Sequence, residues 1–200
     1  MAKSKDKARK AKAKAKARRA IERFHRLCRD GDFEGVRDAL QAGVDVNSET
    51  EFGERGLMAA VIKGHSAVVG LLLEQEGIEV DIVGGFGDSE FSGIPLLIVA
   101  VQCPCAKHVD CVKLLLSDAR VDPNIKDPEM SNISPLMFAV KHNRVDCVKL
   151  LLADTRVDLM TRDEYERSED EAARSQLLIF SGKTNLKTHM SHFVNLIAIS

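Results

Sequence analysis

The chain has 200 residues, which suits one domain with short appendages. Its 44% apolar and 30% charged residues are ordinary for a soluble globular protein, and no apolar run approaches the roughly 18 residues that span a bilayer. The basic start is not followed by the apolar stretch of a secretory signal. We therefore expect no membrane protein, and a cytoplasmic or nuclear location. With 4% aromatic residues and no Trp, the core must be built from Leu, Val, Ile and Ala.

The net charge of −1 hides an uneven distribution. Residues 1–19 hold ten Lys or Arg against Asp6, a net charge of +9, whereas the remaining chain carries a net charge of −10. The alternating Ala and Lys favour a helix, but closely spaced like charges oppose it, so this arm is expected to be disordered or helical. It is a solvated arm, a nuclear-localisation signal or, less readily because it has no aromatic residue to stack on bases, a nucleic-acid-binding arm. Its central basic residues are Lys10, Lys12, Lys14, Lys16, Arg18 and Arg19.

Internal repeats dominate the remaining chain. The octapeptide VDCVKLLL at 109–116 recurs unchanged at 145–152, and looser copies lie upstream. The valines that align are Val36, Val69, Val112 and Val148, at spacings of 33, 43 and 36 residues. Repetition at such spacings is typical of a solenoid.

Each repeat has the same internal order. A first apolar segment is followed by Gly31, Gly64 or Asn143, residue types that tolerate the positive φ of a tight turn after a helix. Pro95 and Pro135 stand where first helices should begin. The pattern predicts helix, turn, helix and extended loop four times, in units of about 21–53, 54–91, 92–131 and 132–164.

These features resemble the ankyrin repeat. Ser134-Pro135-Leu136 matches the family's opening motif, Gly64-His65 its turn, and the triple leucines at 71–73, 114–116 and 150–152 its second helix. The resemblance covers about residues 21–160. It implies an all-α ankyrin-repeat solenoid of stacked helix-turn-helix units with protruding hairpin loops, over residues 20–174.

Three segments depart from the family's pattern. The opening histidine is present only as His25, the loop at 82–93 is longer than usual, and the third unit carries a four-residue insertion around 102–107. A degenerate fifth unit is expected to begin near 161 and to end the solenoid as a partial cap at 165–174. The C-terminal tail comprises residues 175–200, of which 181–200 fit no repeat. Its apolar end, 193–199, either folds back on the cap or is unstructured.

The resemblance implies a non-enzymatic adaptor or scaffold that binds another protein, acts as a monomer, and uses no cofactor or metal. The family's binding surface consists of the hairpin tips, here 48–55, 82–93, 125–132 and 161–166, and the ends of the first helices. The tips combine acidic and apolar residues, which favours a partner with a basic segment. The contact residues that the resemblance assigns are Glu51, Phe52, Glu54, Arg55, Ile62, Lys63, Phe86, Asp88, Glu90, Phe91, Gln102, Asp127, Glu129, Met130, Lys141 and His142. The alternative is a nucleic-acid- or ribosome-associated factor that binds through its basic arm.

The cysteines suggest one more site. Cys103, Cys105, His108 and Cys111 have the ligand types of a zinc site, but Cys111 occupies the position of Cys147 in the repeat, where both are expected to be buried. A redox-active or modified Cys103 or Cys105 is favoured over metal binding, because the insertion should project from the body. The odd number of cysteines favours free thiols in a reducing compartment.

Overall fold

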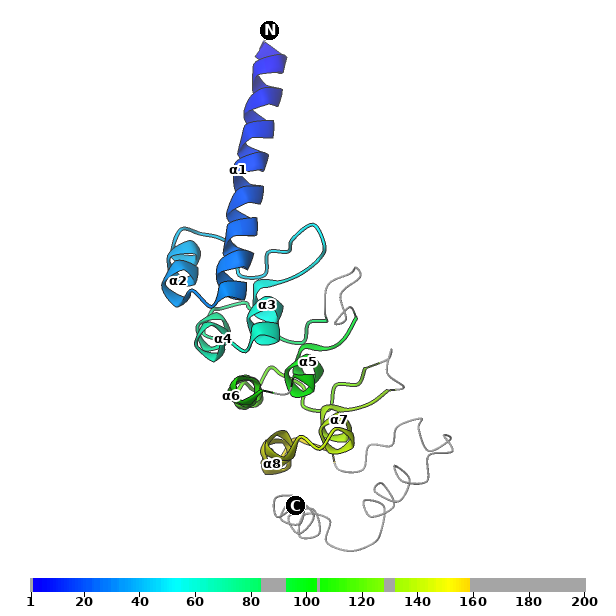
Figure 1. Ribbon diagram of the computed structural model, residues 1–200. Coiled ribbons are helices and arrows are strands. Elements are labelled where there is room, and N and C mark those ends of the chain that lie inside the picture. The colour runs from blue at the N-terminus through cyan, green and yellow to red at the C-terminus, as the bar shows by residue number, and fades with distance from the viewer. Residues whose placement is uncertain (1, 84–92, 104, 128–131, 159–200) are drawn as a thin grey trace, which may run out of the picture.

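The computed structural model describes residues 2–83, 93–103, 105–127 and 132–158 (Figure 1). This part of the chain holds eight α-helices and no strand. The helices are α1 (Ala2–Asp30), α2 (Phe33–Gln41), α3 (Gly56–Lys63), α4 (Ser66–Leu73), α5 (Leu96–Gln102), α6 (Ala106–Ser117), α7 (Pro135–Lys141) and α8 (Val145–Ala153). None of these helices is both long and apolar enough to cross a membrane.

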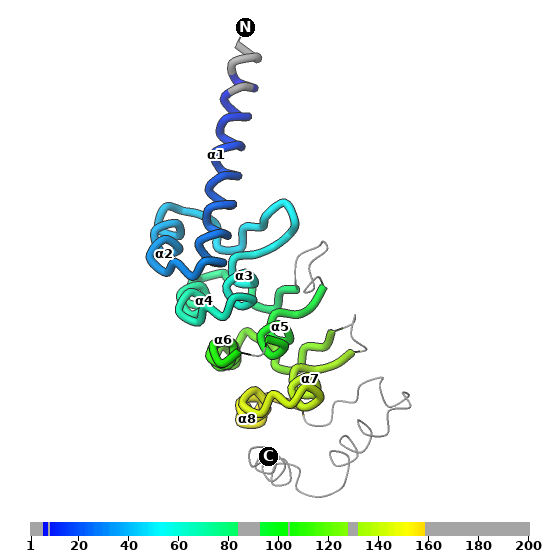
Figure 2. Tube along the Cα trace, in the orientation of Figure 1, coloured from blue at the N-terminus to red at the C-terminus, as the bar shows by residue number. Residues whose placement is uncertain are grey.

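Consecutive helices form pairs, and the pairs stack into one row (Figures 1 and 2). The odd-numbered helices line one side of the row, and the loops that join successive pairs extend from that side. Single antiparallel bridges narrow these loops, at Glu49 and Arg55, at Val83 and Pro95, and at Asp127 and Ile133. This arrangement confirms the helix-turn-helix solenoid predicted from the repeats.

The two rows of helices bury different amounts of surface. Residues 56–61 of α3 and 96–101 of α5 are all buried. In contrast, α6 and α8 bury one face and expose the other to solvent, and α4 buries one face and leaves most of the other half-buried. The aligned valines belong to the buried face, with Val36, Val69 and Val112 at 0% exposure and Val148 at 4%. The repeat period predicted from the sequence is therefore the period of the core.

The turns inside the units confirm the expected backbone. Gly31, Gly64 and Asn143 have φ values of 76°, 70° and 54°. Pro135 is the first residue of α7, and Pro95 directly precedes α5. The single opening histidine, His25, is 2% exposed, and its Nε2 lies 2.9 Å from the Ser48 carbonyl oxygen, so it ties the first helix to the first hairpin.

One repeat position links each unit to the unit before it. His65 Nε2 donates to the carbonyl oxygen of Arg29 at 2.9 Å, and His108 Nε2 donates to that of Ile62 at 3.1 Å. In the last described unit, Arg144 donates to the carbonyl oxygen of Gln102 at 3.0 Å. All three residues lie four positions before an aligned valine and satisfy a carbonyl at the end of a preceding first helix.

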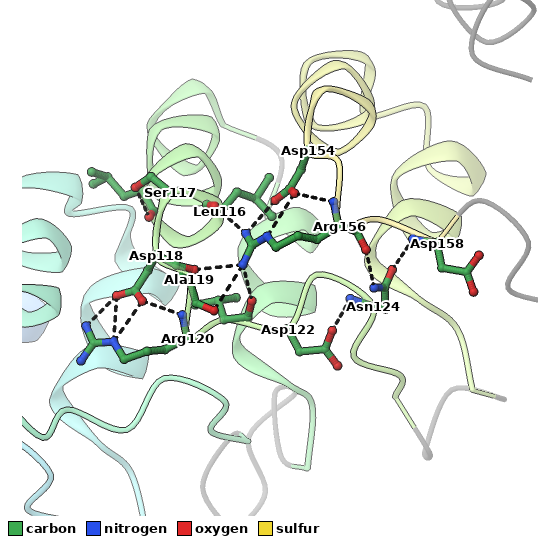
Figure 3. Close-up of polar contacts among 12 residues, drawn as sticks. Leu116, Ser117, Asp118, Ala119, Arg120, Asp122, Asn124, Asp154, Arg156 and Asp158 are labelled. Carbon is green, nitrogen blue, oxygen red and sulfur yellow. Dashed lines mark hydrogen bonds and ion pairs between the residues drawn. The ribbon is translucent and has the colours of Figure 1, made fainter.

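Two arginines link the units at the opposite end of the second helices, and Figure 3 shows the contacts of one of them, Arg156. Arg156 donates to the carbonyl oxygens of Leu116 at 2.7 Å and Val121 at 3.0 Å, and Asp154 holds the guanidinium in place. Arg120 makes the equivalent bond to the Leu73 carbonyl oxygen at 2.7 Å. Each arginine therefore satisfies a carbonyl near the C-terminus of the preceding unit's second helix.

Candidate protein-interaction surface

Little of the first helices in the second and third units is available to a partner. Because residues 56–61 and 96–101 are buried, only the ends of α3 and α5 reach solvent. There, Ile62 and Gln102 are half-buried and Lys63 is exposed. At the end of α7, Lys141 and His142 are both exposed. All five contact residues expected at the turn ends therefore reach solvent, three of them exposed and two half-buried.

His142 is held in place by an aromatic neighbour. Its ring stacks on Phe138 with centroids 4.2 Å apart and an interplanar angle of 25°. Partial burial, and then the charges of Lys141 and Arg144, lower the pKa of His142 below its ordinary value. At neutral pH the residue therefore offers a flat, uncharged ring beside the cationic Lys141.

The first hairpin tip, residues 48–55, presents a single large apolar side chain. Thr50 Oγ1 accepts from the backbone N–H of Phe52 at 3.3 Å and of Glu54 at 3.1 Å, and Gly53 has a φ of 69°. This local turn leaves the Phe52 side chain 73% exposed. An exposed phenylalanine on a hydrogen-bonded tip is well suited to insert into a pocket on another protein.

The acidic residues of this tip are matched by the protein's own arginines. Glu51 pairs with Arg18 at 2.5 Å, and Glu54 pairs with Arg29 at the same distance. Arg55 pairs with Glu49 at 2.8 Å and also with Glu79. Every acidic residue of this tip is therefore paired with an arginine of the protein itself. The tip does not add support for the expected preference for a basic partner.

Asp127 does not belong to an exposed surface. Its side chain is 0% exposed, its N–H donates to the carbonyl oxygen of Ile133 at 3.1 Å, and its own carbonyl accepts from Asn132. It lies at the base of its loop, so its expected role as a contact residue is corrected to a structural one.

Six expected contact residues lie outside the described residues: Phe86, Asp88, Glu90, Phe91, Glu129 and Met130. The tip at 161–166, the cap and the C-terminal tail also lie outside them.

The basic arm forms the N-terminal two thirds of α1. The helix continues without interruption through residue 20 into the first repeat, and it projects from the stack (Figure 1). The six basic residues named above, from Lys10 to Arg19, are all exposed. Arg18 bonds to Glu22 at 2.8 Å as well as to Glu51, and these contacts raise the pKa of Arg18.

The cysteines divide by burial. Cys28, Cys111 and Cys147 are buried, as expected for the last two, and burial raises the pKa of Cys28 and Cys111 to about 12. Cys105 is exposed, and its Sγ lies 2.7 Å from His108 Nδ1. Within the described segments, no three metal-ligating side chains come together as a metal site would require.

The sequence pattern did not point to three features of the molecule's exterior. It did not indicate that Phe33, at the start of α2, and Val83 are exposed at 37% and 47%. The pairing of Arg18 with Glu51 also went unrecognised, because it joins residues 33 positions apart across a loop. The opposite charges of arm and tip were the only signal available.

Comparison with known proteins agrees with the geometry. Residues 24–127 match a family model described as ankyrin repeats in three copies, and residues 131–164 match a single ankyrin repeat. No curated protein matches the chain. Ankyrin repeats generally serve as protein–protein interaction modules and are typically non-enzymatic. The two matches together span more than half of the sequence, and the chain belongs to the ankyrin repeat family.

Proposed function

We propose that this protein is a non-enzymatic adaptor that holds a protein partner against the tip of its first hairpin and the exposed ends of α3, α5 and α7. The observation that carries the proposal is Phe52, which is 73% exposed at a hydrogen-bonded tip. Interface energy concentrates in a few large, desolvated side chains, and aromatic residues are enriched among them.

The opposite side of the solenoid supports this choice of surface. The exposed positions of α6 and α8 include Asp110, Lys113, Asp146 and Lys149, so that both charge signs alternate along the outer helices. Interface cores are depleted of charged residues, and such a mixed surface favours contact with water. The tips and turn ends also carry charged residues, but they add the apolar or aromatic side chains of Phe52, Ile62 and His142.

The chain offers a matched control for the test. Phe33 is also an exposed phenylalanine, at 37%, but it begins the outer helix α2. Once a partner has been identified with the full chain, we expect Phe52→Ala to weaken its affinity at least about tenfold, as for a central apolar anchor. Phe33→Ala should leave the affinity within about twofold, and both variants should unfold like the wild type. Equal affinities for Phe52→Ala and the wild type, measured by titration calorimetry, would remove this tip from the surface.

A second candidate function rests on the arm. Its basic side chains project from a continuous helix at about 1.5 Å per residue, so cationic charge is dense along one rod. Such a rod can neutralise several phosphates of a nucleic acid without reading its sequence. The pairing of Arg18 with Glu51 ties the base of the rod to the first hairpin.

This function predicts a strong dependence on salt. The full chain should bind a fluorescent RNA or DNA duplex with an affinity that falls linearly on a logarithmic scale as salt rises, because counterions are released. A chain that starts at Ala20 should not bind. Binding that persists without the arm, or that is insensitive to salt, would contradict this second function without affecting the first.

A further inference from the structure

The insertion in the third unit lengthens a helix by one turn. His65 and Arg144, the residues that link the neighbouring units, are the N-caps of α4 and α8. The equivalent His108 is instead the third residue of α6, which has 12 residues against 8 and 9 in α4 and α8. Four inserted residues correspond to about one turn of α-helix, so the extra turn precedes His108 while His108 keeps its bond to Ile62.

The extra turn brings a thiol next to a histidine whose orientation is fixed. Cys105 is the N-cap of α6, and residues three apart on a helix lie on one face. Its Sγ is 2.7 Å from His108 Nδ1. On the other side of the ring, Nε2 faces the carbonyl oxygen of Ile62, which can only accept, so Nε2 carries a proton and Nδ1 is left to share one with the sulfur. Cys105 Sγ, the His108 ring and the Ile62 carbonyl oxygen therefore form a chain of a nucleophile, a base and a group that orients the base.

The two side chains differ in exposure in the way that a reactive thiol requires. The His108 ring is 6% exposed and packs on the turn of the preceding unit, where a Cβ at Gly64 would lie 3.1 Å from its Cε1. The Cys105 thiol is exposed and reachable from solvent. It also stands at the N-terminus of a 12-residue helix, where the helix dipole favours negative charge.

We propose that Cys105 is a thiol–disulfide exchange site that takes low-molecular-weight disulfides, with His108 as its base. His108 Nδ1 accepts the thiol proton, and the Cys105 thiolate attacks one sulfur of the small disulfide. A bond forms between Cys105 Sγ and that sulfur, while the disulfide's own S–S bond breaks. The departing thiolate takes the proton back from His108, so that one small thiol is released for each mixed disulfide formed.

Glutathione disulfide is the probe for this site. The full chain is incubated with it at neutral pH, and the adduct is located by peptide mass spectrometry. We expect one glutathione per chain, at Cys105, which Cys105→Ser abolishes and Cys103→Ser, two residues away in the same insertion, preserves. An adduct at another cysteine, or none, would overturn the proposal.

The role of His108 needs a readout that loss of structure alone would not produce. We expect His108→Gln to slow the exchange at Cys105 at least about tenfold and to change its pH profile, because the base is removed. His65→Gln loses the equivalent bond to Arg29 but has no thiol partner, so its rate should match the wild type. A His108→Gln rate equal to that of the wild type would show that the imidazole does not act on the thiol.

A comparison within the wild type tests the same point without a variant. The folded chain should react at Cys105 at least about tenfold faster than the chain unfolded in urea, where the thiol and the imidazole no longer meet. Equal rates in the two states would likewise overturn the proposal.

Discussion

Two turn positions require glycine, both because of their backbone conformation and because side chains of the next unit lie close to them. Gly31 and Gly64 have φ values of 76° and 70°, in the left-handed region that other residues rarely adopt. A Cβ at Gly31 would lie 2.5 Å from Nδ1 of His65, the residue that links the second unit to the first. The turn glycine thus makes room for the ring of the next unit.

A pair of substitutions separates these two effects. Gly31→Ala and Gly43→Ala both place a side chain at positive φ, which costs about 1–2 kcal/mol, but nothing lies within 4 Å of a Cβ at Gly43. We expect Gly31→Ala to lower the free energy of unfolding by about 1–3 kcal/mol more than Gly43→Ala does, because it also overpacks the turn. Urea denaturation of the two variants measures the difference. Equal losses of free energy of unfolding in the two variants would mean that the His65 ring moves away from the new Cβ at no cost.

His25 makes stability depend on pH. Burial is the main cause that lowers the pKa of His25 below 6.5, and partial burial lowers the pKa of His142 in the same direction. Below about pH 6.5 the unfolded chain binds protons that the folded chain does not, so the free energy of unfolding falls as the pH falls. This contribution is complete above that pH.

Urea midpoints measured between about pH 7.5 and about pH 5.5 check this window, which lies above the titration range of ordinary carboxylates. The midpoint should fall as the pH is lowered, and the fall should be smaller in His25→Gln. His142→Gln serves as the comparison and should reduce the fall less than His25→Gln does, because that ring is exposed. A midpoint that rises on acidification would contradict the assigned direction.

The repeat pattern predicted the buried residues better than the surface pairs. The aligned valines and the turn residues Gly31, Gly64 and Asn143 follow from spacing and backbone preference, and the structure confirms them. Burial of Asp127 could not be foreseen, because a hairpin aspartate looks alike in sequence whether it points outward or beneath its own loop. Long-range pairs such as Arg18 with Glu51 depend on where a loop folds back, which local spacing does not contain.

Among the structural elements, the second helices α4 and α6 receive hydrogen bonds at their C-terminal ends from the unit that follows. Neither α6 nor α8 ends on a left-handed glycine, since Asp118 and Asp154 have φ values of −86° and −78°. The carbonyls near the end of α6 are satisfied instead by Arg156 of the next unit (Figure 3). Asn124 adds a second link, accepting from the N–H of Asp158 at 2.6 Å and donating to the Arg156 carbonyl at 2.8 Å.

This capping predicts an unequal response to arginine removal. Arg156→Ala should lower the free energy of unfolding by about 1–3 kcal/mol, because several carbonyls lose a charged donor at once. Arg37→Ala, which removes only an exposed pair with Glu34 on α2, should cost less than about 1 kcal/mol. Chemical denaturation checks both. If Arg156→Ala lowers the free energy of unfolding no more than Arg37→Ala does, water replaces the guanidinium without a loss of stability.

At the scale of the elements, the structure decides the conformation of the arm and corrects the expectation for the insertion. The Ala and Lys alternation left the arm open between disorder and helix, and the described residues place it in α1, continuous with the first repeat. The insertion was expected to project from the body. It lengthens α6 instead and leaves Cys105 exposed at its N-cap, because four residues fit one helical turn.

The whole molecule has two dissimilar sides and one projecting helix (Figures 1 and 2). The side with the odd-numbered helices carries the hairpins and Phe52, whereas the outer helices expose charged residues of both signs. Successive units contact each other through repeated positions, so the stack holds its hairpins in a row along one side. This asymmetry is the basis of the proposed adaptor role.

Site-specific photo-crosslinking in lysate tests that role most directly. A photoreactive phenylalanine analogue, which keeps the aromatic ring, replaces Phe52 at the first hairpin tip or, as a control, Lys113 on the exposed face of α6. The experiment is run on the full chain and on a chain that starts at Ala20, each after nuclease treatment. We expect the same protein to be captured from position 52 in both chains and not from position 113. Capture from position 113 alone, or loss of all capture after nuclease, would contradict the hairpin side as the binding surface.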